Sequence, residues 1–409
     1  MNVDMFPADA QDRIQRLEPA DLVLALSGCG TLEGLRAGTD AVRRGTTHRT
    51  ILVHPDTIET VEVLPAGENS GDIQLVPCRM PAVEPQPFAT EEARTLLRQL
   101  SVIGGLAGAR GYGLVGAPPE GITPATIHAL ADPVINLQID LALPSYSRHR
   151  FDGLINRGVV YPLVRALYGK RADGQLGVDF GLSARMLSAL IGQDDRPGPR
   201  PSIWLLTEAI ERNFQVCQAH VGTFLPPVET SSELSTSLAR VLGSLFDDME
   251  QHASLWQRVR GSQPLQTFGD AVAPPDEPRP VDVRTMVESF RLGVLNLPDI
   301  WMRVLPPASL IELGRLARVP LDQFRLPDAL WARIVFDFAL GHRLRVINRD
   351  HLLRAMTPLY LAWVASFMLE VCDASRGGVR DRLERLCLAF EAEKPYVIAR
   401  WRWPDRFNP

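Results

Sequence analysis

A stretch between residues 144 and 192 gathers the side chains best suited to chemistry. It runs PSYSRHRFDGLINRGVVYPLVRALYGKRADGQLGVDFGLSARMLSALIG and sets charged and amide groups among aromatics and glycines. These groups belong to Arg148, His149, Arg150, Asp152, Asn156, Arg165, Lys170, Arg171 and Asp179. Arginine and lysine near a strand end suit a phosphate or carboxylate ligand. An acid on the glycine-flanked turn GVDFG suits contact with a substrate. Composition alone leaves a solvated charged loop as an equal alternative.

Other motifs in the chain carry weaker indications of chemistry. SGCGTLEG (27–34) follows an apolar run where a dinucleotide fingerprint would stand, but Glu33 replaces its third glycine, which favours a tight strand-to-helix turn. The glycines of 103–113 lack the GK[ST] of a phosphate loop and favour helix packing. His342 and His351 lack zincin spacing, so hydrogen bonding is favoured over metal ligation. No G-x-S-x-G nucleophile motif is present in the sequence.

Length and composition indicate an ordinary globular protein with two domains. The chain has 409 residues, 45% of them hydrophobic and 22% charged. A net charge of −5 gives no electrostatic case for a nucleic-acid partner. The five cysteines are widely spaced without a CxxC pair, which argues against a disulfide framework or a structural zinc and favours a reducing cytoplasm.

Two segments bear on membranes and targeting. The first residues, MNVDMFPADAQDRIQ, do not combine a basic region with an apolar core, so we expect no signal peptide and a cytoplasmic protein. The most apolar window, 356–369, contains a proline and is too short to cross a bilayer. We therefore predict a buried helix there and no membrane span.

The elements that must position the chemical groups alternate between short apolar runs and helical patterns from about residue 20 to 230. Strands are predicted at 21–27, 49–55, 72–77, 112–117 and 135–144, and helices at 32–45, 90–110 and 123–132. This alternation favours an α/β layer with a mostly parallel sheet. Ligands of such folds lie at the carboxyl ends of the strands.

The pattern changes after residue 263. Residues 264–280 are rich in proline and predict a linker or a long surface loop. Beyond them, apolar residues recur with a helical period, so 281–395 is predicted to be nearly all helix. The predicted organisation is an α/β domain over 1–263, a linker over 264–280 and a helical domain over 281–409.

The 144–192 stretch resembles the centre of a family of bacterial GT-A-type glycosyltransferases, related to the mannosylglycerate and glucosyl-phosphoglycerate synthases. Members of that family carry a stretch similar to YSRHKFDG…YPLTRALYGKR…GGDFG. The C-terminal segments VESFRLGVLNLPDIW, PDALWARIVFDFALGHRLRVINRDHLLR and TPLYLAWVASF are also similar to that family. The resemblance covers most of residues 20–370 and is most specific over 144–185. It implies a GT-A-like nucleotide-diphospho-sugar transferase domain.

The resemblance implies a nucleotide-sugar donor, such as a UDP- or GDP-sugar, and a small polar acceptor like glycerate. Asp56 matches the acid that contacts the nucleobase, and Lys170 and Arg171 are the basic side chains available to the donor diphosphate. The acceptor-binding positions are matched by Arg148, Asp152 and Asn156.

The acid near the reacting centre is matched by Asp179, which would orient the acceptor hydroxyl and stabilise positive charge on the sugar. We expect Asp56, Arg148, Asp152 and Asp179 to converge on one cleft at the carboxyl ends of the strands.

The chain departs from the family at three parts of the donor site. The family strand ending in Asp-x-Asp here ends in Gly116, Ala117 and Pro118, when aligned on the following Ile-Thr-Pro. Pro226 stands near the position of a distal histidine, and His220 is shifted by six residues. The usual P-x-Y-N after the first strand has become SGCG (27–30). Because oxygen ligands hold the Mg²⁺ or Mn²⁺ that neutralises a diphosphate, we expect this metal site to be lost.

Two hypotheses follow for function. One is a metal-independent glycosyltransferase that neutralises the diphosphate with basic side chains among residues 148–171. The other is a catalytically inactive homologue that acts as a binding or regulatory partner. The lost carboxylates favour the second, and the retained Asp179 and basic loop favour the first. The helical tail is compatible with a homodimer, although nothing in the sequence requires one.

Overall fold

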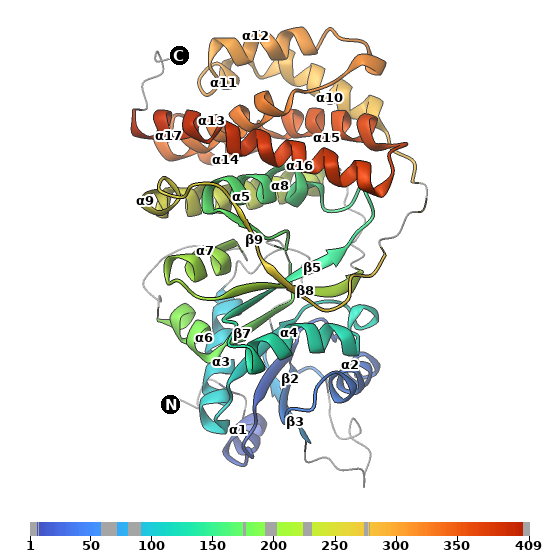
Figure 1. The fold of residues 1–409 in the computed structure, drawn as a ribbon, viewed down its shortest axis with the longest axis vertical. Coiled ribbons are helices and arrows are strands. Elements are labelled where there is room, and N and C mark those ends of the chain that lie inside the picture. Colours follow the sequence, from blue (N-terminus) through green and yellow to red (C-terminus); the bar gives the residue numbers. More distant parts are fainter. Residues whose placement is uncertain are drawn as a thin grey trace. The chain divides into compact units, whose positions relative to one another are not determined.

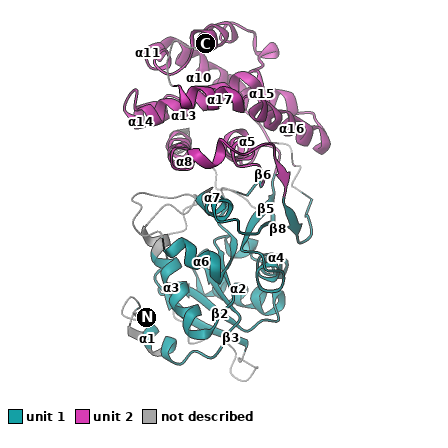
Figure 2. Cartoon of the chain, turned by 60° about the vertical axis from the view of Figure 1, so that its left-hand side comes forward, with its two compact units in different colours: residues 1–148, 172–225, 265–275 teal, residues 149–171, 226–264, 276–409 magenta. Residues whose placement is uncertain are grey.

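The computed structural model describes residues 6, 8–58, 72–80, 91–174, 177–192, 203–223, 231–273, 277 and 279–403. The chain forms two compact units (Figure 2). Unit 1 comprises residues 1–148, 172–225 and 265–275, and unit 2 comprises residues 149–171, 226–264 and 276–409.

Unit 1 is built on an eight-stranded, mostly parallel sheet (Figure 1). Its strands are β1 (Leu22–Leu26), β2 (Thr50–Pro55), β3 (Ile73–Cys78), β4 (Gly111–Val115), β5 (Leu141–Ser147), β7 (Phe180–Ser183), β8 (Val216–Thr223) and β10 (Gln266–Phe268). Their order is β10-β8-β5-β7-β4-β1-β2-β3. Only β7 is antiparallel to its neighbours, β4 and β5, among the described strands of this sheet.

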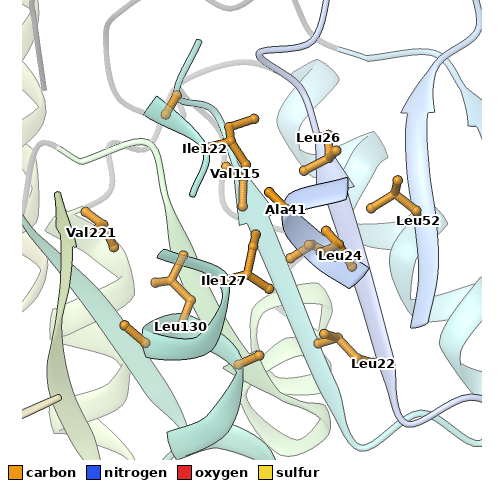
Figure 3. Packing of buried hydrophobic residues seen from close by; sticks show 14 of the residues in the cluster. Leu22, Leu24, Leu26, Ala41, Leu52, Val115, Ile122, Ile127, Leu130 and Val221 are labelled. Carbon is orange, nitrogen blue, oxygen red and sulfur yellow. The ribbon is translucent and has the colours of Figure 1, made fainter. Parts of the chain in front are cut away.

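Helices cover this sheet, and the apolar core of unit 1 lies between the two. They are α1 (Ala8–Gln15), α2 (Leu32–Gly45), α3 (Glu91–Ala107), α4 (Pro124–Asn136), α6 (Ala184–Ile191) and α7 (Ile203–Glu211), with a 3-10 turn η3 (Pro119–Gly121). Alternate residues of a strand face opposite sides of a sheet, so Leu22, Leu24 and Leu26 share one face. In Figure 3 they lie in one cluster with Ala41 of α2 and Ile127 of α4.

The predicted α/β architecture with a mostly parallel sheet is confirmed in unit 1. The predicted helix at 32–45 has the same bounds as α2, and the strands predicted at 21–27, 49–55, 72–77 and 112–117 correspond to β1, β2, β3 and β4. The strand predicted at 135–144 begins later, at Leu141. The reason is that α4 extends to Asn136, since its apolar residues continue the helical period past Pro133.

Unit 2 is almost entirely helical. Its helices are η4 (a π-helix, Asn156–Val160), α5 (Tyr161–Tyr168), α8 (Ser231–Gln251), α9 (Ala253–Trp256), α10 (Val283–Asn296), α11 (Pro298–Trp301), α12 (Pro307–Leu316), η5 (Leu321–Gln323), α13 (Asp328–Leu344), α14 (Arg349–Arg354), α15 (Thr357–Val371), α16 (Arg376–Ala392) and α17 (Lys394–Arg402). A short parallel pair, β6 (Lys170–Arg171) and β9 (Gln263–Pro264), completes the unit. Residues 281–395 contain no strand, as predicted.

The compact units are bounded differently from the predicted domains, whose borders were 263 and 281. Residues 149–171 and 226–264 belong with the C-terminal helices. The reason is visible at Arg165, a fully buried guanidinium of α5 that pairs with Glu384 and Glu391 of α16 at 2.6 and 2.8 Å. The predicted linker also contains a sheet strand, β10, which pairs with β8.

The apolar stretch around 356–369 is a buried helix, as predicted. Among the described residues, one helical stretch, Arg349–Val371, has the length and composition to cross a membrane. However, 72% of its most apolar window is buried inside the structure. Trp363 and Phe367 of α15 stack on each other there, with ring centroids 5.4 Å apart. These features are those of a core helix.

Candidate functional site

Three segments meet at the carboxyl end of β4 in unit 1. The parallel register Leu26↔Val115 brings the turn after β1 beside residues 116–118. The antiparallel register Leu114↔Phe180 brings the start of β7, and so Asp179, to the same strand end. Sheet pairing therefore places SGCG (27–30), the Gly116–Ala117–Pro118 segment and the acid of GVDFG together.

Asp179 is buried and bonded to the end of β4. One carboxylate oxygen accepts the backbone amides of Gly116 and Ala117 at 2.8 and 3.0 Å. The other accepts the Tyr146 hydroxyl at 2.5 Å, and the same hydroxyl accepts the Val178 amide at 3.2 Å. Only 1% of Asp179 is exposed. Burial raises its pKa above the ordinary range, and these hydrogen bonds oppose the rise.

The backbone of the turn after β1 packs closely against the same strand end. A Cβ at Gly28 would lie 2.0 Å from the carbonyl oxygen of Ala117, so only glycine fits there. A Cβ at Gly116 would lie 2.9 Å from Cβ of Val178 and 3.0 Å from its carbonyl oxygen. Cys29, in the same turn, is fully buried, and burial raises its thiol pKa to about 12, so it is not a nucleophile.

The described residues at this strand end do not fit a divalent cation. Mg²⁺ and Mn²⁺ need several oxygen ligands, commonly carboxylates. Gly116, Ala117 and Pro118 carry no side-chain oxygen, and the carboxylate of Asp179 already accepts three hydrogen bonds. The one described group of three or more histidine, cysteine or acidic side chains with ligand spacing lies elsewhere, in unit 2. An aspartate at position 116 would also require Val178 to move.

Asp56 and Arg148 stand at the same edge of the sheet as Asp179. Asp56 follows β2, is exposed, and donates its amide to the carbonyl of Cys78 at 2.9 Å. Because β2 is two strands from β4, Asp56 stands about 10 Å along the sheet from the end of β4. The guanidinium of Arg148, which follows β5, lies 4.8 Å over the ring of Tyr146. A positive charge therefore stands beside the Tyr146–Asp179 pair.

The other predicted site residues belong to unit 2. Asp152 is buried, and one of its oxygens accepts the guanidinium of Arg279 at 2.6 Å. Its second oxygen has no hydrogen-bond partner among the described residues. Asn156 is buried at the start of the π-helix. Lys170 and Arg171 form β6, and Arg171 donates to the Ser262 hydroxyl at 3.1 Å. Convergence of the predicted residues on one cleft thus stays a prediction, because they are divided between the units.

Several residues of the 149–171 stretch bind other parts of unit 2. The ring nitrogen of Pro162 has no proton to donate to the carbonyl of Gly158, four residues earlier. The indole of Trp331 donates to that carbonyl instead, at 2.8 Å. A Cβ on Gly158 would lie 2.3 Å from the ring of Trp363. Arg150 donates to three carbonyls at and just after the end of α15, at 2.7 to 3.2 Å. Much of the stretch that carries the family resemblance therefore has a structural role.

Sequence reasoning missed two features of the site. Tyr146 is the first, although its position in a strand that runs toward the basic cluster could have indicated it. The second is that Asp179 binds the end of β4, which follows only from the antiparallel insertion of β7. His220 lies in β8, while the predicted histidine position at Pro226 falls outside the described residues.

No family model matches the chain, and no curated protein matches it. Among solved structures, the chain is similar to glucosyl-3-phosphoglycerate synthase from Mycobacterium tuberculosis in complex with Mn²⁺, uridine-diphosphate-glucose and phosphoglyceric acid. The identity is 15% and the TM-score 0.36, over 56% of this chain and 80% of that chain. Another crystal structure of that synthase gives 16% and 0.34, over 61% and 85%. A structure described as a mycobacterial protein gives 14% and 0.35, over 61% and 78%. The likeness is distant.

Proposed function

We propose that this chain is a glycosyltransferase-like protein that has lost metal-assisted sugar transfer and acts as a binding or regulatory partner. The proposal starts from the family resemblance of residues 144–185 and from the α/β sheet with its C-terminal helices. The proposal excludes metal-assisted transferase activity, because the residues at the end of β4 do not fit a divalent cation. A diphosphate held in a cleft needs its charge compensated, since desolvating an unpaired charge is costly.

One observation carries the proposal. The carboxylate of Asp179, the residue matched to the reacting centre, accepts the amides of Gly116 and Ala117 and the hydroxyl of Tyr146. An acid that orients an acceptor hydroxyl must reach it within hydrogen-bond distance. Asp179 is 1% exposed, and both of its carboxylate oxygens accept hydrogen bonds. These hydrogen bonds join the ends of β4, β5 and β7.

The alternative is a metal-independent transferase, and Arg148 favours it. Its guanidinium stands over Tyr146 at the sheet edge where a donor would bind, and a fixed cation can replace a metal in stabilising a leaving diphosphate. In this alternative Asp179 supports the site through Tyr146, as a positioning residue.

A panel of UDP-, GDP- and ADP-sugars tests the proposal, with glycerate and phosphoglycerate as acceptors and with either EDTA or Mn²⁺ present. We expect neither hydrolysis nor transfer by the folded protein. Turnover that survives EDTA and is lost in Arg148→Ala, but kept in Arg110→Ala as a surface control, would establish the metal-independent enzyme. Turnover that requires Mn²⁺ would contradict both forms of the proposal.

A further inference from the structure

A cluster on α8 and α13 of unit 2 combines two carboxylates with a buried imidazole. Asp247 and Glu250 are three residues apart on α8, which places them on one face of that helix. His342 stands in the last turn of α13. One ligand atom from each of the three residues lies within 4.8 Å of the others.

The imidazole of His342 is the observation that points to a ligand. The residue is only 2% exposed, and its Nδ1 atom has no hydrogen-bond partner among the described residues. This nitrogen faces the carboxylate of Asp247 at 3.8 Å, beyond hydrogen-bond distance. A buried ring nitrogen without a partner costs free energy unless something binds it.

The cluster already holds a positive group. The guanidinium of Arg349, the first residue of α14, lies 3.1 Å from Asp247 and 3.1 Å from Glu250. Its Nε atom donates to the carbonyl oxygen of His342 at 3.2 Å. Arg349 is about one-third exposed, so its side chain can leave toward solvent without unpacking a core. Arg345, the residue after α13, is the other cation that acts on this cluster.

We propose that Asp247, Glu250 and His342 form a binding site for a divalent transition-metal ion of the Zn²⁺ type, in competition with Arg349. One imidazole nitrogen and two carboxylate oxygens are ligands that Zn²⁺ accepts, and they leave a position for water. Calcium and magnesium are disfavoured, because they prefer sites made of oxygen ligands.

The protonation state of His342 agrees with this assignment. Burial, together with the positive charges of Arg349 and Arg345, lowers its pKa to about 4. The imidazole is therefore neutral near pH 7, the form that binds metals. The two nearby arginines repel a cation and so lower the affinity of the site for a metal ion. Binding of an ion therefore requires that Arg349 move away from the two carboxylates.

Competition between the protein and a chromophoric chelator for Zn²⁺ measures the affinity, using untagged protein in a Cys372→Ser background to remove an exposed thiol. Arg349→Ala should bind Zn²⁺ about tenfold more tightly than the parent, because two partly exposed ion pairs no longer compete. Glu250→Gln and His342→Ala should each bind at least about tenfold more weakly. His351→Ala, which changes an exposed histidine on α14, should match the parent.

Visible absorption with Co²⁺ in place of Zn²⁺ gives a second measurement. Co²⁺ absorbs strongly in a low-coordinate protein site and weakly as the hydrated ion, so the Arg349→Ala protein should develop strong bands that Arg349→Ala/Glu250→Gln lacks. Glu250 is exposed, so this second variant keeps the test valid if His342→Ala fails to fold. Equal Zn²⁺ affinity in the parent, Arg349→Ala and Glu250→Gln, without Co²⁺ bands, would overturn the proposal and leave an ion-pair cluster.

Discussion

Replacing Gly28 by alanine tests whether the turn after β1 is pressed against the end of β4. The added Cβ would lie 2.0 Å from the carbonyl oxygen of Ala117 and 2.9 Å from that of Gly116. Both obstacles are backbone atoms, which cannot rotate away as a side chain would. Either the turn or the strand end must therefore move by more than 1 Å, since ordinary contact is about 3.4 Å or longer.

The expected cost is that of forcing an extra group into a packed interior, about 1–3 kcal/mol or more. The hydrogen bonds of Asp179 to the strand end raise the cost, because moving Ala117 stretches them. Alanine at position 28 restricts the unfolded chain and returns about 0.4–1 kcal/mol, which does not offset the clash. For a domain of this size, a loss of 2 kcal/mol corresponds to a decrease of about 4–8 °C in Tm.

Gly30→Ala is the matched control, because it lies two residues away in the same turn and nothing stands within 4 Å of its added Cβ. Thermal unfolding followed by circular dichroism should show a lower Tm for Gly28→Ala and an unchanged or slightly higher Tm for Gly30→Ala. Equal Tm values for the two variants would refute the close packing of the turn after β1 against the end of β4.

Three further predictions concern stability. Gly158→Ala should lower the free energy of unfolding by about 2 kcal/mol or more, measured by urea unfolding, since its Cβ would lie 2.3 Å from an indole ring. Gly314→Ala, in open space within α12, is the control and should raise the same free energy by about 0.5–1 kcal/mol. Tyr146→Phe should cost about 1–3 kcal/mol in the same assay, because it leaves an oxygen of the buried Asp179 without its hydroxyl donor. Burial raises the pKa of Asp337 from 3.8 to about 7, so the folded state holds a proton that the unfolded state releases. Stability should therefore fall by about 3 kcal/mol as pH rises from 4 to 7. Asp337→Asn should lack this component of the pH dependence, and an unchanged slope would show that the carboxyl is ionised throughout.

The sequence allowed the architecture to be predicted well where periodicity is strong. The alternating leucines at 22–26 and the helical pattern of residues 32–45 allowed β1 and α2 to be predicted. Alternation and the helical period directly reflect which face of an element is buried. The helical C-terminal region followed for the same reason. The short strands β7 and β10 were missed, since runs of three or four residues carry too little periodicity to be recognised.

The candidate site was only partly predictable, because its key contacts join residues far apart in the sequence. Asp179 was identified as an important acid, but its bonds to the amides of Gly116 and Ala117 depend on an antiparallel register between β4 and β7. Arg165 looked like one more charge in a basic loop. Its full burial depends on acids of α16 more than 200 residues later.

Titration calorimetry with UDP and GDP, in Mn²⁺, in Mg²⁺ and in EDTA, measures whether the metal-assisted donor site is lost. We expect that neither cation increases nucleotide binding over the EDTA control, because the end of β4 offers no free carboxylate. Tight binding that requires Mn²⁺ or Mg²⁺ and is lost on Asp56→Ala, but kept in Asp40→Ala, would contradict it.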